Sequence, residues 1–190
     1  MKSNINELSR RELGQLFPIK LMKHDPAWIG MAFEEEMFLR FLLGDDVVRI
    51  THIGSTSVPD LLAKPTIDLL LEIDEHADVQ ALLQRLSKEG YEYNYDKTRI
   101  APGYMLMKGY TMQGFVGQAF HVHMRYPGDY DEVYFCTYLA NHKDVAQAYA
   151  SLKADLGKRF EHDREAYTNG KTAFIQKYTA LARKENANTK

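Results

Sequence analysis

Apolar residues at helical spacing begin the chain. Residues 6–17 carry leucines among charged residues, which predicts a short helix, and residues 19–23 are predicted as a strand. Asp25 and Pro26 supply the cap and the first-turn proline of a longer helix, which Gly44 ends. That helix has a broad apolar face, typical of packing on a core. The face is formed by Trp28, Met31, Phe33, Met37, Phe38, Phe41 and Leu42.

Two strands are predicted after Gly44. Residues 47–53 alternate as a strand does, and Gly54 ends them abruptly. Val47, Arg49 and Thr51 are expected on one face, and Val48, Ile50 and His52 on the other. Residues 66–73 form a nearly continuous apolar run, which is typical of a strand buried on both faces. Asp68 and Glu72 interrupt this run, and a lone carboxylate there is costly unless it has a function.

The rest of the chain changes from a mixed pattern to a wholly helical one. A helix is predicted over residues 77–88, and strands over 91–95, 104–110 and 118–125. In the last strand, Phe120, Val122 and Met124 alternate with His121, His123 and Arg125. Three helices follow. We therefore expect one α/β (α+β) domain over residues 1–190, with a sheet-containing part at about 18–126 and a helical C-terminal tail at about 130–186.

Composition narrows the class of protein. The chain has 190 residues, 45% of them hydrophobic and 26% charged, as in soluble globular proteins. Its net charge of -2 lacks the basic excess that drives non-specific nucleic-acid binding, so nucleic acid is not an expected partner. No apolar run is long enough for a membrane span and no signal peptide is evident, so we expect a cytoplasmic protein without a membrane partner. Cys136 is the single cysteine, which excludes an intrachain disulfide.

The turn at residues 54–56 and the strand predicted at residues 66–73 suggest an anion site. Gly54 permits close approach of backbone and ligand, while Ser55 and Thr56 offer hydroxyl and amide groups that can bind phosphate oxygens. Asp68 on the neighbouring strand could hold a divalent metal against those phosphates. On these residues alone, a simple turn beside a hydrogen-bonded carboxylate is an equally good interpretation.

A longer block favours the functional interpretation. It reads His52-Ile53-Gly54-Ser55-Thr56-Ser57-Val58-Pro59, followed by Ala63-Lys64-Pro65-Thr66-Ile67-Asp68. This block closely resembles the core signature of the GrpB family of the nucleotidyltransferase superfamily, and the resemblance extends from about residue 20 to 180. It implies a nucleotidyltransferase-like mixed sheet flanked by helices. It also implies transfer of a nucleoside monophosphate from ATP or another nucleotide to an unknown acceptor, with Mg²⁺ as cofactor.

The resemblance assigns roles to individual residues. It implies Asp68, His121 and His123 as catalytic residues, with Asp68 also holding the metal. Phosphate contacts are predicted for Gly54, Ser55, Thr56, Lys64, Arg125 and Lys171. Lys153, Arg164 and Tyr167 lie at matching positions in the helical tail, where any side chain that faces the sheet would add to the site.

The acidic triad of the superfamily is incomplete in this sequence. Leu70 stands where the second carboxylate is expected, and Glu72 lies about 13 Å along the strand from Asp68, at about 3.3 Å per residue. The missing carboxylates favour an alternative, a catalytically degenerate nucleotide- or phosphometabolite-binding protein. A third hypothesis, hydrolysis at a metal held by His121 and His123, ranks last because a histidine pair more often lines a polar pocket.

Overall fold

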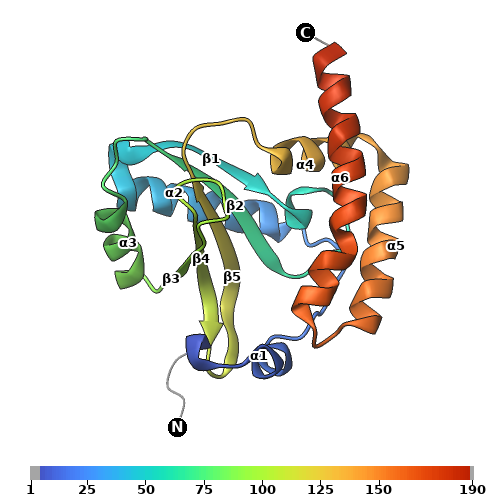
Figure 1. Ribbon diagram of the computed structural model, residues 1–190, viewed down its shortest axis with the longest axis horizontal. Helices are drawn as coiled ribbons and strands as arrows, with labels where there is room; N and C mark the ends of the chain where they lie inside the picture. Colours follow the sequence, from blue (N-terminus) through green and yellow to red (C-terminus); the bar gives the residue numbers. More distant parts are fainter. Residues whose placement is uncertain (1–4, 189–190) are drawn as a thin grey trace.

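A five-stranded sheet lies at the centre of the computed structural model, which describes residues 5–188 (Figure 1). The strands, in the order β1-β2-β5-β4-β3, are β1 (Val47–Ile53), β2 (Thr66–Ile73), β5 (Gly114–Arg125), β4 (Tyr104–Thr111) and β3 (Glu92–Tyr95). The α-helices are α1 (Arg10–Leu16), α2 (Ala27–Leu43), α3 (Val79–Lys88), α4 (Asp131–Asn141), α5 (Lys143–Arg159) and α6 (Arg164–Asn188). Short 3₁₀ turns are η1 (Ile5–Glu7), η2 (Gly44–Asp46) and η3 (Ser55–Ser57).

Strand register divides the side chains of the sheet between two faces. β2 pairs in parallel with β5, so that Asp68 lies opposite His121, whereas the other strand pairs are antiparallel. The alternate residues, such as Leu69 and Val122, are buried in the main core with side chains of α2 and α3. The opposite face is turned toward α4, α5 and α6 (Figure 1). The predicted mixed α/β sheet with flanking helices and a helical C-terminal tail is therefore confirmed.

The C-terminal helices share a second core with the loop that follows η3. Val58 and Leu61 from this loop pack in one buried cluster with Phe135, Leu139 and Tyr149 from the helices. Burial of these side chains fixes the loop against α4 and α5. The end of β1 and the helical tail, far apart in sequence, are thereby held together.

Three local predictions at the start of the chain were wrong, two of them only in part. The predicted helix over 6–17 is divided, because Ser9 and Glu12 form a capping box that starts α1 at Arg10. Residues 19–23 form no strand and contribute only an isolated bridge from Met22 to Ala63. In α2, the buried side is formed by Trp28, Ala32, Glu35, Leu39 and Leu43, whereas Met31, Phe33, Met37 and Phe41 are exposed. α2 is apolar around most of its circumference, so periodicity alone could not select the buried side.

The alternation predicted for β1 is interrupted by a bulge. Val47 pairs with Ile73 while Arg49 pairs with Glu72, so one residue of β1 is unpaired between them. Val47 consequently packs against the main core, on the same side as Ile50, and not on the side of Arg49 as predicted. In the described part of the chain, no helix is long and apolar enough to cross a membrane.

Candidate functional site

A cavity of about 770 Å³ lies between the sheet and the helical tail. Its walls come from the end of β1, the loops around η3, β2 and β5 on one side, and from α4, α5 and α6 on the other. The polar side chains that line it include Ser55, Lys64, Asp68, His121, His123, Lys153, Arg164 and Lys171. Folding thus brings together residues that are more than one hundred positions apart.

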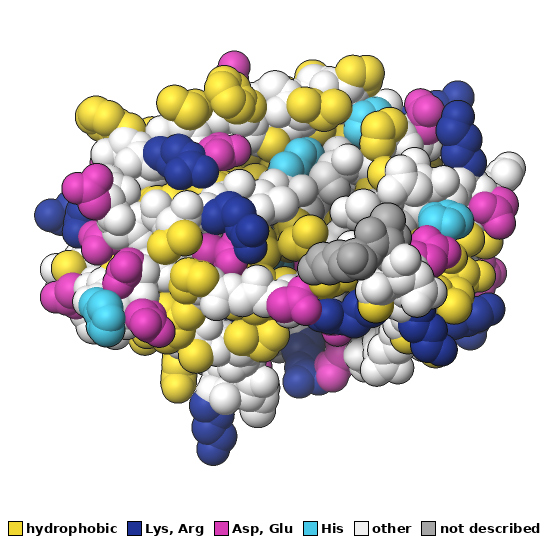
Figure 2. All heavy atoms as spheres, turned by 90° about the horizontal axis from the view of Figure 1, so that it is seen from above, with side chains coloured by type: hydrophobic (Ala, Val, Ile, Leu, Met, Phe, Trp, Pro, Cys, Tyr) yellow, Lys and Arg dark blue, Asp and Glu magenta, His cyan; other side chains and the backbone are white. Residues whose placement is uncertain are grey.

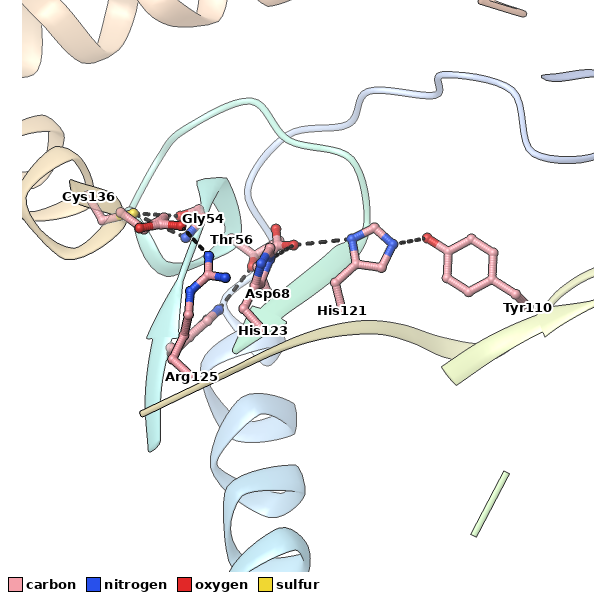
Figure 3. Close-up of polar contacts among 10 residues, drawn as sticks. Gly54, Thr56, Asp68, Tyr110, His121, His123, Arg125 and Cys136 are labelled. Atoms are coloured by element: carbon pink, nitrogen blue, oxygen red, sulfur yellow. Dashed lines mark hydrogen bonds and ion pairs between the residues drawn. The ribbon is translucent and has the colours of Figure 1, made fainter. Parts of the chain in front are cut away.

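Asp68 and two histidines form the polar centre on the sheet (Figure 3). Nδ1 of His121 lies 3.2 Å from Oδ1 of Asp68, and Nε2 of His123 lies 3.7 Å from the same oxygen. On the other side of the His121 ring, Nε2 lies 2.7 Å from the Tyr110 hydroxyl. In the tautomer that satisfies both contacts, His121 donates from Nδ1 to the carboxylate and Nε2 accepts from Tyr110. Asp68, His121 and Tyr110 therefore form one hydrogen-bonded row.

The charge states in this row follow from burial and contact. Burial by itself raises the pKa of Asp68, but the contacts with His121 and His123 outweigh burial and hold that pKa well below its ordinary value. Burial lowers the pKa of His121, although its hydrogen bond to Asp68 opposes the shift. An ionised carboxylate beside a neutral imidazole therefore lines the cavity at neutral pH.

Gly54 is fitted against Asp68 where β1 ends. Its φ of +74° is unfavourable for residues with a side chain, and a Cβ there would lie 2.5 Å from Oδ2 of Asp68. The Gly54 amide lies 3.1 Å from Sγ of Cys136. Burial raises the pKa of the Cys136 thiol to about 11, so at neutral pH this thiol is protonated and a poor nucleophile.

Basic side chains from the loop before β2, from α5 and from α6 converge in the cavity. Lys153 is 2% exposed, and its Nζ donates to Oγ of Ser55 at 2.9 Å and to the Leu62 carbonyl. Burial, together with the charges of Lys171 and Lys64, lowers the pKa of Lys153 to about 7. Burial also lowers the pKa of Lys64 to about 8, with contributions from Arg164 and Lys171. Burial and mutual repulsion thus act together on the basic groups that meet in this cavity.

Glu72 does not complete a metal centre with Asp68. It is 1% exposed and accepts hydrogen bonds from the Arg49 guanidinium and, at 3.2 Å, from the Gly128 amide. Within residues 5–188, no group of three or more His, Cys, Asp or Glu side chains is arranged to hold a metal ion. The residues present therefore do not fit a Mg²⁺ centre built on the acidic triad of the superfamily.

Most of the predicted site residues line the cavity, and two side chains do not. Gly54, Ser55, Lys64, Asp68, His121, His123 and Lys171 all line it. Thr56 is 1% exposed and its hydroxyl lies 2.9 Å from Nε2 of His52. Arg125 is buried, donates to Glu132 at 3.0 Å and lies over the Tyr130 ring. Both side chains are occupied away from the cavity.

The sequence did not predict Tyr110, Asp129 or Asp131 as part of the site. Tyr110 follows Gly109, and the pairing of β4 with β5 shifts between Lys108 and Tyr110, so strand alternation does not predict where the ring points. Asp129 and Asp131 line the cavity and are both paired with Arg183 of α6, at 2.7 and 2.6 Å. No signal in the sequence pairs these segments.

Comparison with known proteins identifies relatives that match this chain over most of its length. A UPF0157 protein of Pseudomonas aeruginosa is 35% identical over 168 residues, which cover 86% of this chain and 67% of that protein. The glutamate-rich protein GrpB of Alkalihalophilus pseudofirmus is 28% identical over 158 residues, covering 82% and 90%. The crystal structure of GrpB from Enterococcus faecalis aligns with a TM-score of 0.77 at 30% identity, covering 88% of this chain and 99% of that chain.

Other relatives are longer proteins. The chain spans 45% of the Bacillus subtilis protein YqkA, at 28% identity over 161 residues. It also spans 46% of dephospho-CoA kinases from Mycobacterium, at 25% identity over 190 residues, so the activity in that name belongs to proteins about twice as long. The family described as GrpB protein matches residues 18–181. The chain therefore belongs to the GrpB family.

Proposed function

We propose that this protein binds a phosphorylated small molecule, a nucleotide or another phosphometabolite, in the cavity between the sheet and the helical tail. The observation that carries the proposal is the convergence of Lys64, Lys153, Arg164 and Lys171 on one wall. Several cations held close together in a partly buried cavity are costly, and a phosphate group would supply both negative charge and several hydrogen-bond acceptors.

The rest of the cavity suits the organic part of such a ligand. Tyr149, Tyr167, Phe135 and Ile175 line it with apolar surface, and Tyr167 is already stacked under Lys171, whose Nζ lies 4.5 Å from the ring centre. Aromatic rings can hold a base or another flat group by stacking. This combination of a cationic wall and an aromatic wall supports the nucleotide or phosphometabolite class.

Binding is expected not to require a divalent metal. Asp68 is the one carboxylate at the centre of the sheet face, and Glu72 is engaged by Arg49 and Gly128. A single aspartate is a weak magnesium site. The lysine wall, and not a metal ion, would then neutralise the phosphate charge. A cytoplasmic location stays a prediction.

Calorimetry with ATP and with pyrophosphate, each in EDTA and in Mg²⁺, tests the proposal. We expect binding in EDTA, and a loss of about tenfold in affinity in Lys171→Met, because a charge-assisted hydrogen bond is removed. Lys177→Met is the matched control, since Lys177 lies on the same helix over the Tyr178 ring but does not line the cavity. No binding of either compound, or equal binding by wild type and Lys171→Met, would overturn the proposal.

Nucleotidyl transfer is the second candidate. Asp68 is the observation in its favour, because an ionised carboxylate lies directly beside Gly54 at the cavity wall. Incubation with Mg²⁺, nucleotides labelled at the α-phosphate and candidate acceptors should then give label transfer that Asp68→Asn abolishes. Transfer that persists in Asp68→Asn would contradict this role for Asp68.

A further inference from the structure

We propose that Ser55 is a nucleophile and Lys153 its general base, so that the cavity can form a covalent phosphoester on Ser55 without a metal ion. The substrate class is a phosphoanhydride or another compound with an electrophilic phosphoryl group. The inference that the substrate is phosphorylated rests on the proposed function. The inference that Ser55 is reactive does not depend on it.

The first observation is the geometry of the two side chains. Ser55 is the first residue of η3, directly after the left-handed Gly54, and its partly exposed side chain lines the cavity. Lys153 reaches it from α5, with Nζ 2.9 Å from Oγ. This is the hydrogen-bond distance expected between a nucleophile and its base.

The second observation is a third group that orients the base. Nζ of Lys153 also donates to the carbonyl oxygen of Leu62. A neutral amine has two N–H donors and one lone pair. With one N–H directed to Leu62, the lone pair can accept the Ser55 hydroxyl proton, which completes the nucleophile, base and orienting group of such sites.

The third observation is the charge around Lys153. Burial is the main cause that disfavours its charged form, and the charges of Lys171 from α6 and Lys64 from the loop before β2 act in the same direction, whereas Cys136 from α4 favours the charged form. The Tyr149 ring of its own helix lies 4.6 Å from Nζ. Among the ion pairs of the described residues, none joins Lys153 to a carboxylate. These surroundings lower its pKa to about 7, where it can act as a base.

Lys108 shows the contrasting arrangement in the same protein. Its Nζ lies 2.7 Å from Oε1 of Glu35, which is 8% exposed, so this lysine has a carboxylate partner. A lysine held only to keep a loop in place could be paired in the same way. Lys153 instead has a hydroxyl and a carbonyl as partners, beside two further cations.

The proposed step balances without a further reactant. Oγ of Ser55 attacks the phosphorus atom, and its proton passes to Nζ of Lys153 as the new O–P bond forms. The bond between phosphorus and the leaving group breaks, and the leaving group departs with the bonding electron pair. It can then take the proton from Lys153, while Lys64 and Lys171 offset negative charge on the phosphoryl oxygens.

Diisopropyl fluorophosphate tests the reactivity of Ser55 independently of the natural substrate. In this reagent fluoride is the leaving group, and peptide mass spectrometry locates the modified residue. We expect labelling of Ser55 at a rate that rises as the pH increases through about 7 and then levels off, since the neutral form of Lys153 is the base.

Four variants separate the roles. Ser55→Ala should lose the label, and Lys153→Arg, which keeps a cation that cannot deprotonate, should react at least about a hundredfold more slowly. Lys153→Met should also be slow, and circular dichroism checks that each variant is folded. Ser57→Ala is the matched control, because the Ser57 hydroxyl donates to the Gly54 carbonyl at 2.8 Å, whereas Lys153 donates to Ser55 and Leu62.

The outcomes distinguish this inference from the proposed function. Absence of label on Ser55, or equal rates in wild type and a folded Lys153 variant, would overturn the nucleophile even if pyrophosphate binds. Labelling of Ser55 that depends on Lys153, in a protein that binds no phosphate compound, would support the nucleophile and overturn the binding proposal.

Discussion

Gly54 and Asp68 constrain one another at the scale of single residues. A Cβ on residue 54 would lie 2.5 Å from Oδ2 of Asp68 in a backbone with φ of +74°. We expect Gly54→Ala to lower the free energy of unfolding by about 3 kcal/mol, through backbone strain and displacement of the carboxylate. Urea unfolding measures this value. Gly44→Ala is the matched control, because Gly44 has φ of +66° with no atom within 4 Å of a Cβ; its expected cost is only about 1 kcal/mol. Equal losses would contradict the clash.

Lys153 should make stability depend on pH. Its pKa is about 7 in the folded protein against an ordinary value of 10.5, so between these values the unfolded chain binds more protons. Stability of the ligand-free protein should therefore rise with pH in this window, by at most about 1.4 kcal/mol per pH unit from this group. Below pH 7, Lys153 is protonated in both the folded and the unfolded chain, and the full cost of its buried charge is subtracted from the stability.

Comparison with Lys153→Met isolates this contribution. Urea unfolding from about pH 6 to pH 9 should show wild type gaining stability relative to the variant as the pH rises. The exposed Lys177→Met provides the reference for loss of a lysine from the surface of the helical tail. Parallel curves for wild type and Lys153→Met would show that Lys153 keeps its ordinary pKa.

The sequence predicts the site better on strands than on helices. Asp68, His121 and His123 converge because a strand repeats every two residues and each of them lies on the same face of its strand. The positions of the Lys153 and Arg125 side chains could not be predicted from periodicity. The Lys153 side chain enters the cavity because α5 packs against the loop after η3. Arg125 lies on the predicted face of its strand, but its side chain pairs with Glu132 and not with the cavity. These are tertiary contacts without a local signal.

At the scale of elements, α2 shows how an apolar helix can mislead. Its buried residues follow helical spacing from Trp28 to Leu43, but the outward side carries Phe33, Met37 and Phe41 as well. Periodicity identifies one side only when the other side is polar. The bulge in β1 similarly displaced Val47 from its predicted face. Apart from residues 19–23, element type and approximate boundaries could be predicted, whereas orientation required the packed structure.

Paired substitutions in α2 test its orientation. Leu39 is 0% exposed and Phe41 is 87% exposed. We expect Leu39→Ala to lower the free energy of unfolding by about 3 kcal/mol, because it removes buried methyl groups and leaves a cavity. Phe41→Ala should change it by less than about 0.5 kcal/mol in urea unfolding. A larger loss from Phe41→Ala would mean that its side chain is buried in solution.

At the scale of the whole molecule, net charge and local charge have opposite signs. The chain carries a net charge of -2, and the face in Figure 2 shows acidic and basic side chains interspersed. The lysines of the site instead lie together in the cavity, although they come from segments that are far apart in sequence. Long-range attraction of a polyanion is therefore weak, while a small anion that enters the cavity meets several cations.

This arrangement predicts selectivity for small phosphates over nucleic acid. ATP and pyrophosphate should compete for one site, whereas RNA and DNA should show no gel shift at physiological salt, because a duplex or long strand cannot place several phosphates within the cavity. Affinity for pyrophosphate should also weaken as the pH rises through about 7 and then about 8, where Lys153 and then Lys64 lose their protons. RNA binding that ATP displaces and that Lys171→Met removes would instead show that the cavity admits the end of a nucleic-acid strand.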